Sequence, residues 1–257
     1  MTEQVLEISK SGAVATVAMN RPNQFNALNA ELRSALRNAI AEIDKDGDVR
    51  LAILKGNGRG FCAGADLTGG LKLPVSKQID EEFKPILTGI AQSPKIWIAQ
   101  VHGSAAGIGA AIAMNCDLLA MADDANIYMA FAAIALIPDG GNTQLLLNNM
   151  GYHRAMQAIL EGRKIPADEC LQYGIANALH RAGDLDAATL VWAQKLATGA
   201  PLAMGAAKRL LRQVGHLPFD EAINVEGREQ DPLVESADFR AGVSAFFARE
   251  KPVFTGK

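Results

Sequence analysis

The 257-residue sequence has little excess of charge of either sign and few aromatic residues. It contains 25 basic and 28 acidic side chains, for a formal net charge of −3. Nucleic-acid-binding domains usually carry a basic excess, so this balance argues against such a partner. Aromatic residues make up only 5% of the chain, which predicts an aliphatic core. The 49% hydrophobic and 21% charged fractions exclude a disordered chain.

Cysteines, targeting signals and long apolar runs are also sparse. Cys62, Cys116 and Cys170 are an odd number, which predicts reduced thiols and not a disulfide framework. The first residues lack the basic and apolar regions of a signal peptide. The longest apolar runs, 105–114 and 129–137, are shorter than the ~18 residues that a membrane span needs. We therefore expect a soluble, cytoplasmic protein with no membrane partner.

Several motifs for catalysis and cofactor binding are absent. The chain has neither a P-loop nor the Gly-x-Ser-x-Gly turn of serine hydrolases. Gly103, Gly107 and Gly109 do not form the Gly-x-Gly-x-x-Gly fingerprint of dinucleotide binding. The four histidines are scattered along the chain, without a pair at the spacing of metal ligands. We therefore expect no metal site.

Short aliphatic segments alternate with an amphipathic one in the first half of the chain. Ranges 14–19, 51–54, 96–101 and 118–122 are bounded by polar or glycine residues and predict strands. Range 29–43 has apolar residues at spacings of three and four, and it begins with asparagine, a favoured helix N-cap. Strands that alternate with helices predict an α/β core.

The last third of the chain changes character. Range 201–214 begins with proline and ends before glycine, the asymmetry expected of a helix. Ranges 220–228 and 236–249 follow with little strand signal. We therefore place an α/β core at 1–195 and a mostly helical region at 196–257.

Two glycine-rich turns follow predicted strands. Range 56–67 follows the strand at 51–54, and range 101–111 runs into an alanine-rich helix. Glycine permits positive φ and a close approach of the backbone to a ligand. The first N–H groups of a helix lack intrahelical partners, which suits them to bind an oxyanion. Two such turns can hold two donors on one carbonyl oxygen, as stabilisation of an enolate requires. The alternative is that both are packing turns.

One acidic residue follows the apolar run at 129–137. Asp139 comes directly after Pro138 and before two glycines. A carboxylate flanked by apolar chain is partly desolvated, which raises its pKa and suits it to base catalysis. The alternative is a helix N-cap, because aspartate is favoured there and a helix-like stretch follows.

Other conspicuous side chains have ordinary explanations. Cys62 lies in the first glycine-rich turn and is expected to be a small packing residue. Trp97 is expected in the core or in a subunit contact. The cations Lys208, Arg209 and Arg212 lie along one predicted helix and favour a solvated face, with contact to the phosphates of a ligand as the alternative.

Taken in order, these segments resemble the crotonase, or enoyl-CoA hydratase/isomerase, family over essentially the whole chain. The motifs that carry the resemblance are Asn20-Arg21-Pro22, Asn26-Ala27-Leu28, Phe61-Cys62-Ala63-Gly64-Ala65-Asp66-Leu67, Gly103 to Asp117, Pro138-Asp139-Gly140-Gly141 and Phe246 to Phe254. The resemblance implies an α/β fold, a spiral of repeated ββα units with a helical C-terminal oligomerisation region. It implies assembly into a homo-oligomer, a trimer or a dimer of trimers. It also implies an acyl-CoA thioester substrate and no cofactor beyond its coenzyme A moiety.

The resemblance also assigns roles to individual positions. It makes the backbone N–H groups of Ala65 and Ile108 the oxyanion donors. Isoleucine does not readily adopt a left-handed backbone, so a donor at Ile108 requires negative φ there. The positions that it places against substrate or CoA are Phe25, Asn26, Ala27, Ala63, Gly64, Asp66, Leu67, Gly107, Gly109, Ala111 and Phe131, with Phe246 and Lys251 reaching in from the C-terminal region.

The departures from the family pattern bear on the reaction. Hydratases of the family use two glutamates to activate water, and here those positions hold Ala111 and Phe131. Neither can carry a proton, so hydration through that pair is unavailable. Isomerase-like members place an acid at the position of Asp139, so we expect a Δ3,Δ2-enoyl-CoA isomerase with Asp139 as its base. The alternatives are a hydratase, other enolate or aryl-CoA chemistry in the same pocket, and a non-catalytic acyl-CoA-binding oligomer.

Overall fold

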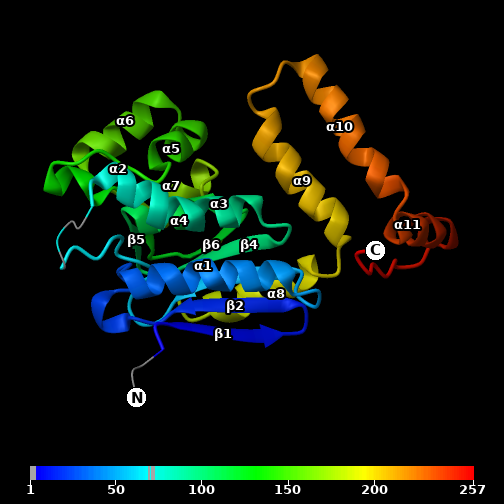
Figure 1. Ribbon diagram of the computed structural model, residues 1–257, viewed down its shortest axis with the longest axis horizontal. Helices are drawn as coiled ribbons and strands as arrows, with labels where there is room; N and C mark the ends of the chain where they lie inside the picture. Colours follow the sequence, from blue (N-terminus) through cyan, green and yellow to red (C-terminus); the bar gives the residue numbers. More distant parts are fainter. Residues whose placement is uncertain (1–3, 69, 71–72) are drawn as a thin grey trace.

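The computed structural model describes residues 4–68, 70 and 73–257, which form two β-sheets surrounded by helices (Figure 1). The larger sheet has six strands in the order β1-β2-β3-β4-β6-β9. β1 pairs with β2 in antiparallel fashion, and the remaining neighbours are parallel. The strands of this sheet are β1 (Leu6–Ser11), β2 (Val14–Met19), β3 (Leu51–Gly56), β4 (Ile96–Val101), β6 (Leu118–Ala122) and β9 (Ala178–His180).

A second sheet of three short strands lies beside the first. Its order is β5-β7-β8, with β5 (Ser104–Ala106), β7 (Asn126–Tyr128) and β8 (Lys164–Pro166). Consecutive strands β4 and β5 enter different sheets, and so do β6 and β7. Helix α4 (Ile108–Asn115) follows β5, so the chain completes a ββα turn there. The expected spiral of ββα units is therefore confirmed.

Helices cover both faces of the larger sheet. Helices α1, α3 and α4 pack on one face, where the main hydrophobic core lies, and α8 covers a smaller apolar cluster on the other. A π-helical turn, η2 (Ile79–Phe83), precedes α3, and 3-10 turns occur at η1 (Pro22–Gln24) and η3 (Ala130–Ile134). The helices of this part are α1 (Ala30–Lys45), α2 (Val75–Gln78), α3 (Lys84–Gln92), α5 (Asn142–Met150), α6 (Tyr152–Glu161), α7 (Ala167–Gln172) and α8 (Leu185–Leu196).

The strands and helix predicted in the first half of the chain are present. Three of the four strands have the predicted bounds, and the one at 51–54 continues to Gly56 as β3. Asn29 is the N-cap of α1, because its side chain accepts a hydrogen bond of 2.9 Å from the N–H of Leu32. The sequence analysis missed β1, an edge strand with mostly exposed side chains and therefore no strong apolar pattern.

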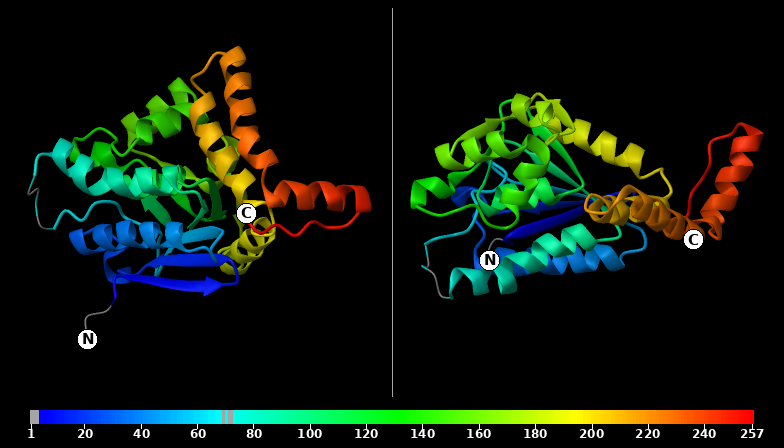
Figure 2. Two further views of the ribbon diagram at one scale, coloured as in Figure 1. Left: turned by 45° about the vertical axis from the view of Figure 1, so that its right-hand side comes forward. Right: turned by 90° about the horizontal axis from the view of Figure 1, so that it is seen from above.

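The last three helices form an arm beside the two-sheet core, consisting of α9 (Pro201–Val214), α10 (Phe219–Val234) and α11 (Ala237–Ala248) (Figure 2). The predicted helix at 201–214 is confirmed, and α10 is longer than predicted at both ends. The division at residue 195 stays a prediction. No helix in the described parts of the chain is both long and apolar enough to cross a membrane.

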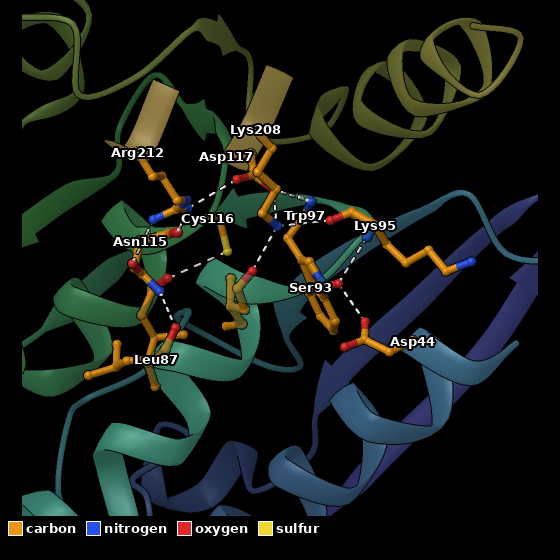
Figure 3. Close-up of polar contacts among 12 residues, drawn as sticks. Asp44, Leu87, Ser93, Lys95, Trp97, Asn115, Cys116, Asp117, Lys208 and Arg212 are labelled. Carbon is orange, nitrogen blue, oxygen red and sulfur yellow. Dashed lines mark hydrogen bonds and ion pairs between the residues drawn. The ribbon is translucent and has the colours of Figure 1, made fainter. Parts of the chain in front are cut away.

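A buried ion pair fastens the arm to the core (Figure 3). The Nζ atom of Lys208, on α9, lies 2.8 Å from a carboxylate oxygen of Asp117. It also donates to the carbonyl oxygens of Ile90 and Lys95 at 2.7 and 2.9 Å. Arg212, one turn further along α9, donates to the other oxygen of Asp117 at 3.0 Å. The predicted solvated face is therefore wrong for Lys208, because the arm folds this residue against the core.

Removal of the Lys208 ammonium should weaken this contact between the arm and the core. Lys208→Met leaves two carbonyl groups without their donor and Asp117 without its buried partner. We expect the free energy of unfolding to fall by about 3–5 kcal/mol, as when one partner of a buried pair is lost. Arg209→Met on the same helix is the matched control, since Arg209 and Glu229 form a more exposed pair worth at most about 1 kcal/mol. Urea denaturation of both variants measures the difference, and equal losses would contradict the prediction.

Candidate active site

The first glycine-rich turn is held to the second by backbone hydrogen bonds. Cys62 forms a parallel bridge with Ala105 of β5. The N–H of Cys62 donates to Ser104 O at 3.2 Å, and the N–H of Ala106 donates to Cys62 O at 2.8 Å. On its other side the turn is bonded to Leu28, whose N–H donates to Gly64 O at 2.8 Å. The chain at 62–66 is therefore fixed from both sides.

The two predicted oxyanion donors face the same region. Leu28 is bonded to the peptide groups on either side of Ala65, so the N–H of Ala65 points away from Leu28. A methyl group built on Gly64 would lie 3.6 Å from the nitrogen of Ile108 and 3.0 Å from Ala106 O. Within the described chain, the N–H groups of Ala65 and Ile108 donate to no acceptor. Both N–H groups are therefore without an acceptor in the described chain, and their role as oxyanion donors stays a prediction.

The second turn leaves Ile108 in an ordinary helical conformation. Gly107 has φ of 53° and ψ of −127°, and Ile108 is not among the residues with positive φ. The condition set for a donor at Ile108 is therefore met, because glycine takes the unusual geometry one residue earlier. Ile108 is the first residue of α4, where N–H groups have no intrahelical acceptor.

Asp139 lies in the turn between η3 and α5, and its carboxyl group is partly buried. Its Oδ1 atom is inaccessible to solvent and has no hydrogen-bond partner in the described chain. Burial raises the pKa of the Asp139 carboxyl above its ordinary value. The N-cap position of α5 is Gly141, and no side chain caps the helix. Asp139 is therefore not the N-cap, which removes the alternative explanation of its position.

Apolar side chains bring the Asp139 turn against α4. A methyl group built on Gly140 would lie 3.1 Å from Ala111 Cβ and would overlap the side chain of Ile108. The Phe131 ring is similarly close to Gly107, at 3.8 Å from a methyl group built there. Both positions that hold glutamate in hydratases are therefore beside the candidate site, and both are apolar. Neither of these positions supplies a second carboxylate next to the Asp139 turn.

Asn26 supports the site from within the protein. Its side chain is fully buried, and its amide nitrogen has the carbonyl oxygens of Asn57, Gly60 and Phe61 within 3.1 Å. Its Oδ1 atom accepts the N–H of Arg21 at 2.9 Å. The contact with CoA expected at Asn26 stays a prediction, and the side chain itself is taken up by these internal hydrogen bonds. Asn26 holds the turn 57–61 in place.

Two other predicted contact residues also have internal roles. Gly109 packs directly on Cys62, and a methyl group on it would lie 2.7 Å from Cys62 O. Gly109 therefore permits a close approach of α4 to the first turn, and its expected ligand contact stays a prediction. Asp66 pairs with Arg21 at 2.9 Å. Hydrogen bonds from Thr68, aided by Arg21, hold the pKa of Asp66 below its ordinary value.

The remaining residues of the first turn and of the segment before α1 stay accessible. Ala63, Leu67 and Phe25 are exposed, and Ala27 is half-buried. The Phe25 ring is stacked under the guanidinium of Arg59, whose carbon lies 4.6 Å from the ring centre. These positions remain candidates for contact with CoA. Cys62 is a packing residue as predicted, because it is buried and burial raises the pKa of its thiol to about 12.

The C-terminal residues are not brought to this site within one chain. Phe246 is on α11, and Lys251 follows this helix. Helix α11 lies at the end of the arm that is distant from α4 and β5 (Figures 1 and 2). The expectation that they contact CoA is therefore not met within a single chain, because α9 and α10 carry them outward.

Comparisons with known proteins agree with this geometry. The family model for enoyl-CoA hydratase/isomerase matches residues 9–257. The chain belongs to this family. A 1,2-epoxyphenylacetyl-CoA isomerase of Escherichia coli is 33% identical, and a probable enoyl-CoA hydratase of Rhodobacter capsulatus is 34% identical, each with full coverage of both chains. An enoyl-CoA hydratase structure from Bacillus anthracis superimposes with a TM-score of 0.94 at 27% identity, covering 99% of this chain and all of that one.

The crotonase fold and an acyl-CoA substrate class follow from family membership. The individual reaction does not, because relatives of nearly equal identity carry the names isomerase and hydratase. In the described residues, no three histidine, cysteine, aspartate or glutamate side chains gather in a way that could hold a metal ion.

Asn142 is a buried residue at this site that the sequence analysis did not single out. It is the first residue of α5, and its side-chain amide donates to Gly107 O and Asp139 O. The available signal was a polar residue directly after Gly140 and Gly141. A polar residue at the start of a helix is common, so this signal carried little weight.

The carboxyl groups of Asp139 and Asp66 should titrate on opposite sides of the ordinary aspartate pKa of about 3.9. Burial keeps Asp139 protonated to higher pH, whereas Thr68 and Arg21 keep Asp66 ionised to lower pH. 13C NMR of protein labelled at the aspartate carboxyl carbons measures both, with Asp139→Asn and Asp66→Asn identifying the two signals. A midpoint for Asp139 at or below that of Asp66 would contradict the burial argument.

Proposed function

We propose that the protein is a Δ3,Δ2-enoyl-CoA isomerase that uses a single carboxylate. The observation that carries the proposal is Asp139, a partly buried carboxyl group in the turn whose Gly140 packs against the side chains of Ile108 and Ala111. A double-bond shift moves one proton from carbon to carbon, so one acid–base group suffices. No cofactor beyond the coenzyme A moiety of the substrate is needed for that step.

In the proposed reaction the thioester oxygen lies between the N–H groups of Ala65 and Ile108. The Asp139 carboxylate removes a proton from the α-carbon of a 3-enoyl-CoA. The electron pair of that C–H bond moves toward the carbonyl, and the negative charge of the resulting dienolate rests on the oxygen between the two donors. Asp139 then returns the proton to the γ-carbon, which leaves a 2,3 double bond and no net change in atoms.

Hydration is less consistent with the same site. Addition of water needs one group to activate the water and another to deliver a proton to carbon. Ala111 is fully buried, and the Phe131 ring occupies the other glutamate position. A buried apolar surface does not order a water molecule, which needs two to four polar partners.

A second candidate is isomerisation or other enolate chemistry on an aryl-substituted acyl-CoA. The observation that favours it is the 33% identity over the full chain to a 1,2-epoxyphenylacetyl-CoA isomerase. An apolar lining of alanine, isoleucine and phenylalanine accepts either a linear or an aromatic acyl group.

The decisive experiment incubates the enzyme with 3-hexenoyl-CoA in D2O and follows both 2-hexenoyl-CoA and deuterium incorporation. We expect the wild type to shift the double bond and Asp139→Asn to lose at least about 10²-fold in rate, the usual contribution of a general base. The matched control is Asp124→Asn, an exposed aspartate outside the site, which should leave the rate unchanged.

Each other outcome overturns the proposal in a specific way. Full activity of Asp139→Asn would remove the base assignment. Efficient hydration of crotonyl-CoA would make the protein a hydratase. Deuterium exchange without a shift would indicate enolate chemistry on another acyl group, such as an aryl one. Binding without exchange, unaffected by Asp139→Asn, would favour a non-catalytic acyl-CoA-binding oligomer.

We also propose that the arm joins copies of this chain into a trimer or a dimer of trimers. Helices α9, α10 and α11 enclose an apolar groove of about 550 Å³. Phe246 and Phe247 line it and are 78% and 79% exposed in a single chain. Such a contiguous apolar surface is typical of a protein interface. In an assembly of this kind, the α11 of one copy is available to the site of another.

Polar replacement of these phenylalanines should weaken assembly. We expect the double variant Phe246→Ser/Phe247→Ser to shift the molar mass, measured by light scattering after gel filtration, toward that of one 27.2 kDa chain. Phe219→Ser is the matched control, because Phe219 is 83% exposed but does not line the groove. An unchanged mass for the double variant would place the interface elsewhere.

A further inference from the structure

The side chain of Asn142 connects the two halves of the candidate site. It is fully buried, at the first position of α5. Its Nδ2 atom donates to Gly107 O at 2.9 Å and to Asp139 O at 3.0 Å. Gly107 precedes the proposed oxyanion donor, and Asp139 is the proposed base. One NH2 group thus bridges the backbones of both functional turns.

The orientation of this amide is set by its surroundings. Both neighbours are carbonyl oxygens, which only accept hydrogen bonds, so the NH2 end of the amide must face them. The Oδ1 end is buried and has no partner in the described chain. A buried acceptor without a partner costs about 1–3 kcal/mol. The unpartnered Oδ1 atom therefore makes Asn142 costly to the stability of the protein. This cost favours a role for Asn142 beyond packing.

The hydrogen bond to Gly107 O helps to set the direction of the Ile108 N–H. The carbonyl of Gly107 and the N–H of Ile108 belong to one planar peptide group and point in opposite directions. Gly107 O also accepts the backbone N–H groups of Ala110 and Ala111 at 3.1 and 3.3 Å, because Gly107 is the N-cap of α4. At 2.9 Å, the Asn142 amide makes the shortest of these three hydrogen bonds and holds the oxygen from the side of α5. It therefore restrains the plane of this peptide, and with it the line along which Ile108 donates.

We propose that Asn142 is a positioning residue that aligns the Ile108 donor and holds the Asp139 turn at a fixed distance from it. The inference rests on the proposed role of Ile108 as an oxyanion donor. Asn142 is buried and makes no contact with substrate, so it acts through the peptide groups that it holds. Misplacement of a catalytic group by about 1 Å can cost about 10²-fold in rate.

Two substitutions at this position test the geometry. Asn142→Asp is nearly isosteric, but it replaces the NH2 donor with a carboxylate oxygen that repels Gly107 O and Asp139 O. Asn142→Ala removes the donor without adding repulsion, and so it serves if the aspartate variant fails to fold. The matched control is Asn149→Ala on the same helix, where the exposed Asn149 amide donates only to Leu145 O.

The primary readout is the thioester carbonyl stretch of bound crotonyl-CoA labelled with 13C at that carbonyl, measured by isotope-edited infrared difference spectroscopy. Hydrogen bonds from two aligned donors lower this frequency on binding. We expect the lowering to be retained in the wild type, Asn149→Ala and Asp139→Asn, and to be largely lost in Asn142→Asp and Asn142→Ala. The measurement needs no turnover, so it separates this inference from the proposed isomerase activity.

The kinetic readout on 3-hexenoyl-CoA should divide in a characteristic way. We expect kcat of Asn142→Ala to fall about 10²-fold with KM little changed, because contacts to the CoA moiety do not involve Asn142. Failure of isomerisation in the wild type together with loss of the infrared shift in the Asn142 variants would overturn the proposed function and leave the positioning role supported. An unchanged infrared shift in folded Asn142→Ala would overturn the positioning role, whatever the activity.

Discussion

Two backbone hydrogen bonds between Cys62 and β5 hold the rest of the site together. They join the loop after β3 to the strand that leads into α4, and so they bring Gly64 beside Gly107. Every later feature depends on this pairing. The buried amide of Asn26 holds the same loop from behind, through three carbonyl oxygens. A backbone fixed on both sides leaves the N–H groups of Ala65 and Ile108 without internal acceptors.

The pairing of Cys62 with β5 also explains the positions of the glycines in the two turns. Gly109 must approach Cys62 too closely for any side chain, and Gly64 and Gly107 both have positive φ. These positions let two turns meet at backbone contact distance. Ile108, one residue later, is helical and buried, and its side chain packs on Gly140. The residue proposed as a donor thereby also contacts the Asp139 turn through its apolar side chain.

Sequence patterns predicted the parts of this arrangement that depend on local chemistry. Short aliphatic runs predicted most of the strands, the helical spacing of apolar residues predicted α1, and Asn29 is the N-cap of α1 as expected. Patterns did not show which polar residues are internal. Lys208 was predicted as a surface cation, but the arm places it against Asp117. Asn26 was predicted as a ligand contact, and its side chain is buried in the structure.

Sequence patterns do not predict how two turns that are distant in the sequence come into contact. From the sequence alone, Asp139 is also consistent with a helix cap, and only the start of α5 at Asn142, after Gly141, removes that explanation. The hydrogen bond from Asn142 to Gly107 O joins residues 35 positions apart, so no local pattern encodes it. The arm presents a similar case, because residues 246–251 lie far from the site of their own chain and a single sequence does not contain the geometry of an assembly.

The backbone and the side chains contribute different parts of the proposed site. This difference explains why sequence similarity identifies the family but not the reaction. The proposed oxyanion donors are backbone N–H groups, which any residue but proline supplies, so such a site tolerates variation in its side chains. The proposed acid–base chemistry depends instead on side chains, here those at positions 111, 131 and 139. Relatives at 33% and 34% identity carry the names isomerase and hydratase. Under the proposed function, the backbone donors stabilise an enolate and the placement of one carboxylate decides where its proton goes, so the reaction depends on side chains that vary between relatives.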